Sequence, residues 1–190
     1  MSEHLGGKNN MVNMYLDVET TGLNPAVDKI ITIQYQKLDW DTGEPVGDLI
    51  ILKDWESSEK EILEKFQAIL GEDKWTFIAH GYNLKFEDDF LRERSITCGL
   101  KKPIKLFDRP TVDLHPLGVL MNNGQFKGSG LDKITDKEGN GLACLAFYNS
   151  KQYDKVTNYI KQEAKEYLKF YVWLRKKMPQ LLTEFRIDCL

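Results

Sequence analysis

The chain has 190 residues, of which 42% are hydrophobic and 29% charged, and its formal net charge is −3. This length and apolar content suit one domain with a real core, so we predict a single domain over residues 11–190 after a loose N-terminal tail at residues 1–10. The slightly acidic balance excludes a global basic field that would recruit nucleic acid, so any such binding must depend on local patches.

The three cysteines at positions 98, 144 and 189 are an odd number and show no CxxC spacing. They favour unpaired thiols in a reducing compartment over a disulfide framework or a zinc site. Residues 1–10 lack the apolar segment of a signal peptide, and no apolar run approaches the roughly 18 residues of a membrane span. We therefore expect a cytoplasmic protein that does not associate with membranes.

Strand-like sequence comes first along the chain, in three ranges. These ranges are residues 11–18, 29–38 and 48–53. In the second range, Ile31, Ile33 and Tyr35 alternate with polar residues, which is typical of a strand with one buried face. A turn signal at residues 41–44 leads from the second range to the third. The pattern predicts three consecutive antiparallel strands.

Helices and short strands alternate after this point. Apolar residues recur at helical spacing from Ser57 to Gly71 and again from Gln152 to Lys177, before Pro179. The shorter segments between them are strands at 75–79 and 111–114, a helix at 86–95, a glycine-rich loop at 124–130 and a short helix near Leu131. This order predicts an α/β fold whose mixed sheet has three antiparallel strands, then parallel strands, flanked by helices.

The first strand delivers two carboxylates and then stops at a glycine turn. Residues two apart in a strand point to the same side, so Asp17 and Glu19 share one face. Like charges this close are costly unless a cation lies between them, and carboxylate oxygens suit Mg²⁺ or Mn²⁺. The pair predicts a divalent metal site, although an edge strand with a solvated acidic face would show the same pattern.

Two later segments place further acidic residues. The helix predicted at 86–95 follows Asn83 and begins with Phe86 and the acidic residues 87–89, which the helix dipole alone would also favour. On the last helix, a spacing of four puts Tyr159 and Glu163 on one face. A Tyr/Glu pair of this kind is by itself an ordinary surface contact, so its meaning depends on the other segments.

Taken in order, these segments resemble the DEDD superfamily of 3′–5′ exonucleases, whose fold is ribonuclease-H-like. Residues 16–23, Leu-Asp-Val-Glu-Thr-Thr-Gly-Leu, match the family's D-x-E-T-T-G-L pattern throughout. Residues 83–87 resemble its N-x-x-F-D motif, while residues 112–114 and 130–134 resemble its connecting strand and following helix. The resemblance covers roughly residues 11–174, nearly the whole predicted domain.

Two residues of the chain depart from the family's second and third motifs, and one residue matches one branch of the family. Glu87 and Glu163 stand where the family has aspartates, although a shift of helix register would put Asp88 or Asp89 in place of Glu87. Tyr159, four residues before Glu163, matches the tyrosine-type branch. The histidine-type branch needs a histidine on the last helix, which has none. We interpret His80 as a structural residue at a strand end and His115 as a turn residue before Pro116.

The resemblance implies a set of site residues. The carboxylates that would hold two Mg²⁺ or Mn²⁺ ions are Asp17, Glu19, Glu87 and Glu163, and Tyr159 would orient the attacking water. The residues predicted to contact substrate are Thr20, Leu23, Asn83, Phe86 and Lys155. Core packing is the alternative role for Phe86. Lysines 161, 165 and 169 form a stripe that we interpret as a solvated face.

The function that follows is a 3′–5′ exonuclease that removes nucleoside 5′-monophosphates from single-stranded or frayed DNA or RNA ends. The main alternative is a nucleic-acid-binding or partner-binding module that kept the fold and lost full metal competence through the two glutamates. A third hypothesis is a nuclease of another polarity, or an endonuclease, on the same fold.

Overall fold

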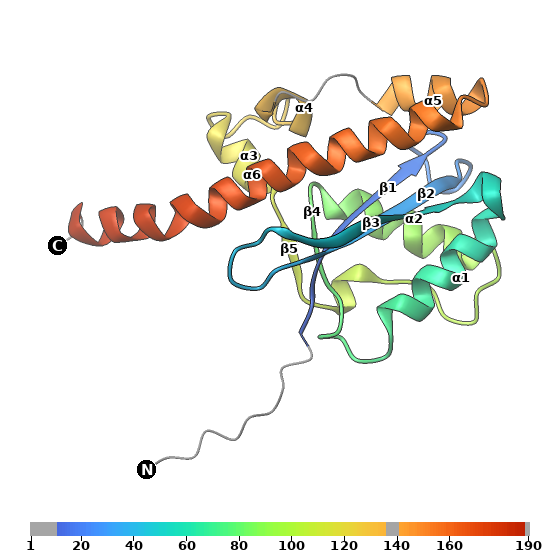
Figure 1. The fold of residues 1–190 in the computed structure, drawn as a ribbon, viewed down its shortest axis with the longest axis horizontal. Coiled ribbons are helices and arrows are strands. Elements are labelled where there is room, and N and C mark those ends of the chain that lie inside the picture. Colours follow the sequence, from blue (N-terminus) through green and yellow to red (C-terminus); the bar gives the residue numbers. More distant parts are fainter. Residues whose placement is uncertain (1–10, 136–140, 189–190) are drawn as a thin grey trace, which may run out of the picture.

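The computed structural model describes residues 11–135 and 141–188, so the tail predicted at residues 1–10 lies outside the described residues. Its centre is a five-stranded sheet in the order β3-β2-β1-β4-β5 (Figure 1). The strands are β1 (Asn13–Thr20), β2 (Ile30–Leu38), β3 (Pro45–Lys53), β4 (Ile78–Gly81) and β5 (Thr111–Asp113). The β1–β2 and β2–β3 pairs are antiparallel, whereas β1–β4 and β4–β5 are parallel, which confirms the predicted mixed ribonuclease-H-like sheet.

Helices pack on both faces of this sheet. They are α1 (Glu59–Leu70), α2 (Leu84–Thr97), α3 (His115–Met121), α4 (Leu131–Ile134), α5 (Gly141–Asn149) and α6 (Tyr153–Asp188), with short 3₁₀ turns η1 (Asp54–Glu56) and η2 (Leu106–Asp108). Leu16 and Val18 of β1 share a core with α1 and α2. Tyr15, on the other face of β1, shares a second core with α6. The alternation in β1 therefore turns its odd-numbered residues, including Asp17 and Glu19, toward α6.

Helix boundaries differ from the sequence prediction in two places. Ser58, and not Ser57, caps α1, because its Oγ accepts a hydrogen bond from the Glu61 N–H at 3.2 Å. Helix α6 continues through Pro179 to Asp188, where the sequence predicted an end at Lys177. Proline removes one backbone donor and so leaves one helical carbonyl without its usual partner, and it does this where the exposed final turns of α6 begin.

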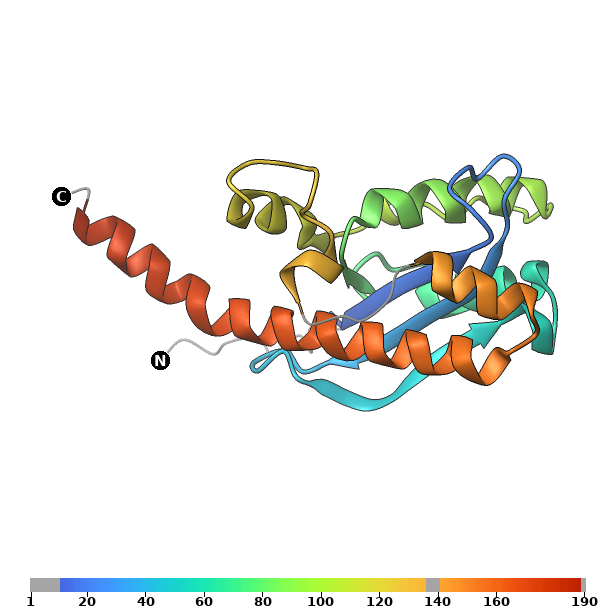
Figure 2. The same ribbon diagram turned by 90° about the horizontal axis from the view of Figure 1, so that it is seen from above.

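Helix α6 runs along the sheet and continues past its edge (Figures 1 and 2). Its first turns lie next to α5, and its last turns extend away from the body. Among the described residues, no helix combines the length and the apolar character needed to cross a bilayer.

Candidate active site

Three carboxylates that are distant in sequence meet between β1 and α6. Ligand atoms of Asp17, Glu19 and Glu163 all lie within 4.8 Å of one another. Asp17 and Glu19 come from one face of β1, and Glu163 comes from the third turn of α6. The pairing of β1 with β2 shifts register between Glu19 and Thr20, so the strand is irregular where its last carboxylate projects.

Glu87 adds a fourth carboxylate beside Asp17 but is not a member of this close group. It lies in the first turn of α2 and is 4% exposed. Burial raises the pKa of Glu87 well above its ordinary value, and the negative charge of Asp17 raises it further. Its Oε2 atom is buried without a hydrogen-bond partner among the described residues. The Glu87 carboxyl group therefore lacks the water or the oppositely charged partner that would stabilise a negative charge.

The neighbouring acidic residues of α2 have other partners, which settles the helix register. Asp88 accepts a hydrogen bond from the Leu106 N–H at 2.6 Å, at the start of η2. Asp89 forms ion pairs with Lys85 and Arg92. Position 87 is thus the one of the three that lies beside Asp17, whereas Asp88 and Asp89 contact other groups.

Tyr159 lies against the same carboxylates. Its side chain is 7% exposed and hydrogen-bonds to Glu163. Burial raises the pKa of Tyr159 far above its ordinary value, and the charges of Glu163, Glu19 and Asp17 contribute in that order. The hydroxyl is therefore protonated throughout the usual pH range, so it acts as a hydrogen-bonding group and not as a base.

These side chains line a cleft of about 290 Å³. Its other lining residues include Asn83 and Phe86, two of the predicted substrate contacts, together with Tyr82, His115, Leu131 and Asp132. Asn83 has a left-handed backbone (φ 66°), which asparagine tolerates better than most residues. Asp113 fixes this turn, because its carboxylate accepts hydrogen bonds from the N–H groups of Asn83 at 2.8 Å and Leu84 at 2.9 Å.

The other three predicted substrate contacts lie outside the cleft lining. Thr20 Oγ1 donates a hydrogen bond to the carbonyl of Gly22 at 2.5 Å. Leu23 is 85% exposed at the tip of the loop after β1. Lys155 lies over the ring of Phe147 in α5, with its Nζ 5.3 Å from the centroid.

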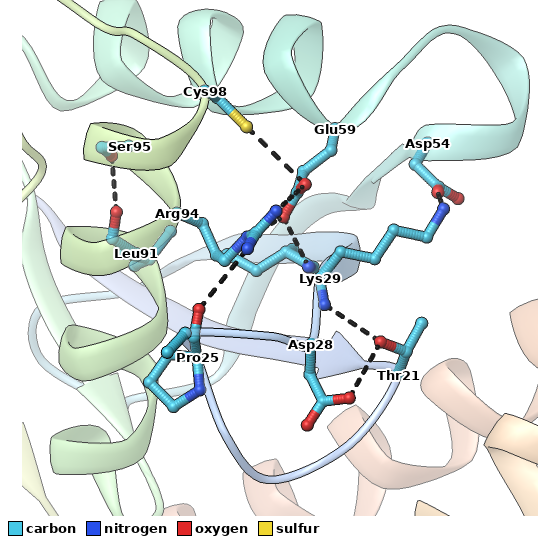
Figure 3. Close-up of polar contacts among 12 residues, drawn as sticks. Thr21, Pro25, Asp28, Lys29, Asp54, Glu59, Leu91, Arg94, Ser95 and Cys98 are labelled. Carbon is cyan, nitrogen blue, oxygen red and sulfur yellow. Dashed lines mark hydrogen bonds and ion pairs between the residues drawn. The ribbon is translucent and has the colours of Figure 1, made fainter.

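A polar network holds the loop between β1 and β2, which includes residues 21–29 (Figure 3). Arg94 of α2 pairs with both carboxylate oxygens of Glu59 at 2.8 and 2.9 Å and also reaches the carbonyl of Pro25. Glu59 in turn accepts from the Ile30 N–H at 2.8 Å. At the end of the loop, Lys29 pairs with Asp54 at 2.6 Å. The turn after Glu19 is thereby tied to α1 and α2.

Sequence reasoning missed two polar neighbours of the carboxylates and misread one histidine. Gln34 of β2 donates to Asp17 at 2.7 Å, and the buried Cys144 of α5 hydrogen-bonds to Glu19. Neither belongs to a recognisable motif, because each reaches the site only through tertiary packing. His115 begins α3 and was wrongly interpreted as a turn residue; Pro116 is compatible with a helix in its first turn. His80 is buried against Asn13, which confirms its structural position.

Comparison with known proteins gives a likeness at the level of fold. No protein-family profile and no curated protein sequence matches the chain. Among solved structures, Escherichia coli exonuclease I in complex with a dT13 oligonucleotide aligns with a TM-score of 0.60 and 12% identity, over 92% of this chain and 43% of that chain. The zinc-ion-bound form of the E. coli exonuclease I–ssDNA complex aligns with a TM-score of 0.61 and 12% identity, over 92% and 42%.

The chain therefore spans less than half the length of the exonuclease I chains that it matches. The likeness, together with the strand order and the helices on both faces, defines a ribonuclease-H-like α/β domain of the kind found in exonuclease I.

Proposed function

We propose that this protein is a metal-dependent 3′–5′ exonuclease of the tyrosine-type DEDD group, acting on single-stranded or frayed DNA or RNA. The observation that carries the proposal is the convergence of Asp17, Glu19 and Glu163 within 4.8 Å, with Tyr159 hydrogen-bonded to Glu163. The likeness in fold to exonuclease I, which was crystallised with oligonucleotides, supports it.

The donor set fits divalent cations. All of its ligand atoms are carboxylate oxygens, which suit Mg²⁺ and Mn²⁺ better than softer metals. The buried Oε2 atom of Glu87 has no hydrogen-bond partner among the described residues, and a cation beside Asp17 would coordinate it. We assign Asp17, Glu19, Glu87 and Glu163 as the ligands. When bound, a pair of cations at such a site supplies an activated water and stabilises the departing 3′-oxygen.

The chain's own residues then position the substrate. The Tyr159 hydroxyl, which keeps its proton, would hold the attacking water in line through a hydrogen bond. Phe86 would stack on the terminal base, a contact that does not depend on the identity of the base. Asn83 also lines the cleft. The cleft, at about 290 Å³, is at the small end of ligand cavities, which suits one terminal nucleotide and not a duplex.

The decisive experiment follows 5′-labelled single-stranded DNA and RNA in Mg²⁺, Mn²⁺ or EDTA, with wild-type protein and Asp17→Asn. We expect a ladder of shortened labelled products with metal, and none with EDTA or with the variant. Oligonucleotide binding without shortening would instead support a binding module. Immediate release of the labelled 5′ nucleotide, or cleavage at internal positions, would support the other polarity or an endonuclease.

A further inference from the structure

The last thirteen residues of the described chain form a helical extension with no cover. All residues from Lys176 to Asp188 are exposed, and α6 carries them away from the sheet (Figures 1 and 2). The extension is nevertheless strongly apolar on one side. Exposed fractions are 41% for Met178, 52% for Leu181, 50% for Leu182 and 63% for Phe185.

These apolar residues continue the stripe by which α6 packs on the sheet. The buried part of the stripe, with alternate spacings of four and three, consists of Ile160, Ala164, Tyr167, Tyr171 and Leu174. The same spacing continues through Met178, Leu181 and Phe185. This is the a/d pattern of a helix that packs against another element along its whole length. The body of the protein covers only the first part.

We propose that the extension pairs in antiparallel orientation with the extension of a second copy of this chain. If Met178 packs beside Leu181 of the second copy, the two-fold axis passes close to Pro179, and Leu174 meets the partner's Phe185. The flanking positions then place Lys177 beside the partner's Glu184, and Glu184 beside the partner's Lys177. One symmetric arrangement therefore satisfies both the apolar stripe and the charges.

The charge positions select this orientation. Lys177 and Glu184 are seven residues apart, about 10 Å along the helix, so they cannot pair within one chain. In a parallel pair, Lys177 would face position 182 of the second copy, which is a leucine. Only the antiparallel pair gives both charges an opposite partner.

The base of the extension offers further apolar surface to the end of the partner's helix. In the antiparallel register, that end reaches the level of Trp173, which is 46% exposed. Trp173 borders a cavity of about 290 Å³ whose other walls include Met121, Ile134 and Phe170. Two helices of this length bury less area than a standard interface of roughly 1,600 Å², so we expect a dimer that dissociates on dilution.

Pairing would leave both candidate active sites open. Met178 follows Glu163 by fifteen residues on the same helix, which is about 22 Å. The proposal therefore does not depend on the proposed nuclease function, and a loss of dimerisation is expected to leave any activity on short oligonucleotides unchanged.

The test is sedimentation equilibrium of the full chain over a wide concentration range. We expect a reversible monomer–dimer equilibrium, abolished by Leu181→Glu and unchanged by Thr183→Glu, a matched control on the opposite side of the extension. Lys177→Glu and Glu184→Lys are each expected to weaken the dimer by roughly three- to tenfold. The double variant should recover wild-type affinity, and a mixture of the two single variants should form heterodimers.

Three outcomes would overturn the proposal. One is a monomer at every concentration, which would mean that the apolar stripe packs against another protein or against another part of a longer chain. Another is a dimer that Leu181→Glu does not affect, provided that circular dichroism shows the variant folded. The third is a dimer in which the double charge exchange gives no recovery, because this would exclude antiparallel pairing of the extensions.

Discussion

Gln34 of β2 hydrogen-bonds to Asp17 on the neighbouring strand β1. The two residues are register partners in the antiparallel β1–β2 pair, and Nε2 of Gln34 donates to Oδ2 of Asp17 at 2.7 Å. The Oε1 atom of Gln34 accepts from Thr32 Oγ1 at 2.9 Å, and both Thr32 and Gln34 are fully buried. The orientation of the Asp17 carboxylate is therefore set by a buried chain of hydrogen bonds within the sheet.

We predict that Gln34→Leu lowers both Mn²⁺ affinity and nuclease activity by about 10- to 100-fold, the usual cost of removing a group that orients a metal ligand. Thr32→Val, which removes only the more distant hydrogen bond, should have a smaller effect. Calorimetric Mn²⁺ titration and the labelled-oligonucleotide assay measure the two quantities. A folded Gln34→Leu protein with wild-type metal affinity would show that Asp17 needs no such support.

Glu87→Gln should change stability and activity in opposite directions. The substitution removes a buried acidic group that faces Asp17, so the metal-free protein should melt at a higher temperature, while activity with metal falls. Thermal melts in EDTA and activity in Mn²⁺ test this. Glu93→Gln, at a partly exposed position of the same helix outside the cleft lining, is a control expected to change neither. A lower melting temperature for Glu87→Gln would indicate that the carboxyl group is structural.

The parts of the molecule that local pattern determines were predictable from the sequence. The period-two alternation around Asp17 and Glu19 placed both carboxylates on one face of a strand, and the spacing of four placed Tyr159 and Glu163 on one face of a helix. The structure brings these pairs together. Chain order and turn signals also gave the mixed sheet, since parallel strands need intervening helices.

The remainder depends on tertiary packing or on weak local signals. Helix α5 is apolar around most of its surface, so its sequence shows no helical period, and Cys144 could not be placed beside Glu19. Gln34 looked like any polar residue in an alternating strand, because only the strand register reveals its partner. Pro179 indicated a helix end, but α6 continues through it to Asp188, so the local cost of one lost hydrogen bond and a crowded carbonyl does not end this helix.

His80 should make the protein sensitive to acid. Burial, with a smaller contribution from the positive charge of Arg175, lowers the pKa of His80 from 6.5 to about 4. Between these values the unfolded chain binds a proton that the folded chain does not, so stability falls as the pH drops through this window, by up to roughly 3 kcal/mol. Urea unfolding should be measured above this pH window and within it. Between the two, the free energy of unfolding should fall less for His80→Gln than for the wild-type protein. Equal losses in both proteins would argue against the shift.

Tyr159→Phe should separate turnover from binding. The variant keeps the buried ring against Val156 and Ile160 and removes only the hydroxyl that we propose aligns the attacking water. We expect turnover to fall by about 10- to 100-fold, while oligonucleotide affinity in Ca²⁺ changes little. If affinity and turnover fall together, Tyr159 contacts the strand and does not act on the water.

The two glutamates provide the sharpest test of the proposed metal site, because they stand where the exonuclease motifs that the sequence resembles have aspartates. Glu163 reaches to within 4.8 Å of Asp17 and Glu19 with its full-length side chain, so the backbone of α6 is placed for a glutamate. Shortening Glu163 or Glu87 to aspartate withdraws the carboxylate by about 1.5 Å, and a misplacement near 1 Å can cost about 100-fold in rate. We therefore expect each single variant to lose activity although it introduces the aspartate of the motif that the sequence resembles.

The double variant, Glu87→Asp with Glu163→Asp, distinguishes adaptation from decay. If the site has adapted to glutamates, the double variant should be less active than either single variant. An increase in activity from a nearly inactive wild type would instead mean that the glutamates are lesions in a former nuclease.

Wild-type activity should also be higher in Mn²⁺ than in Mg²⁺, because Mg²⁺ demands a near-ideal octahedron that Mn²⁺ does not. Higher activity in Mg²⁺ would show that the glutamates have not altered the geometry of the site.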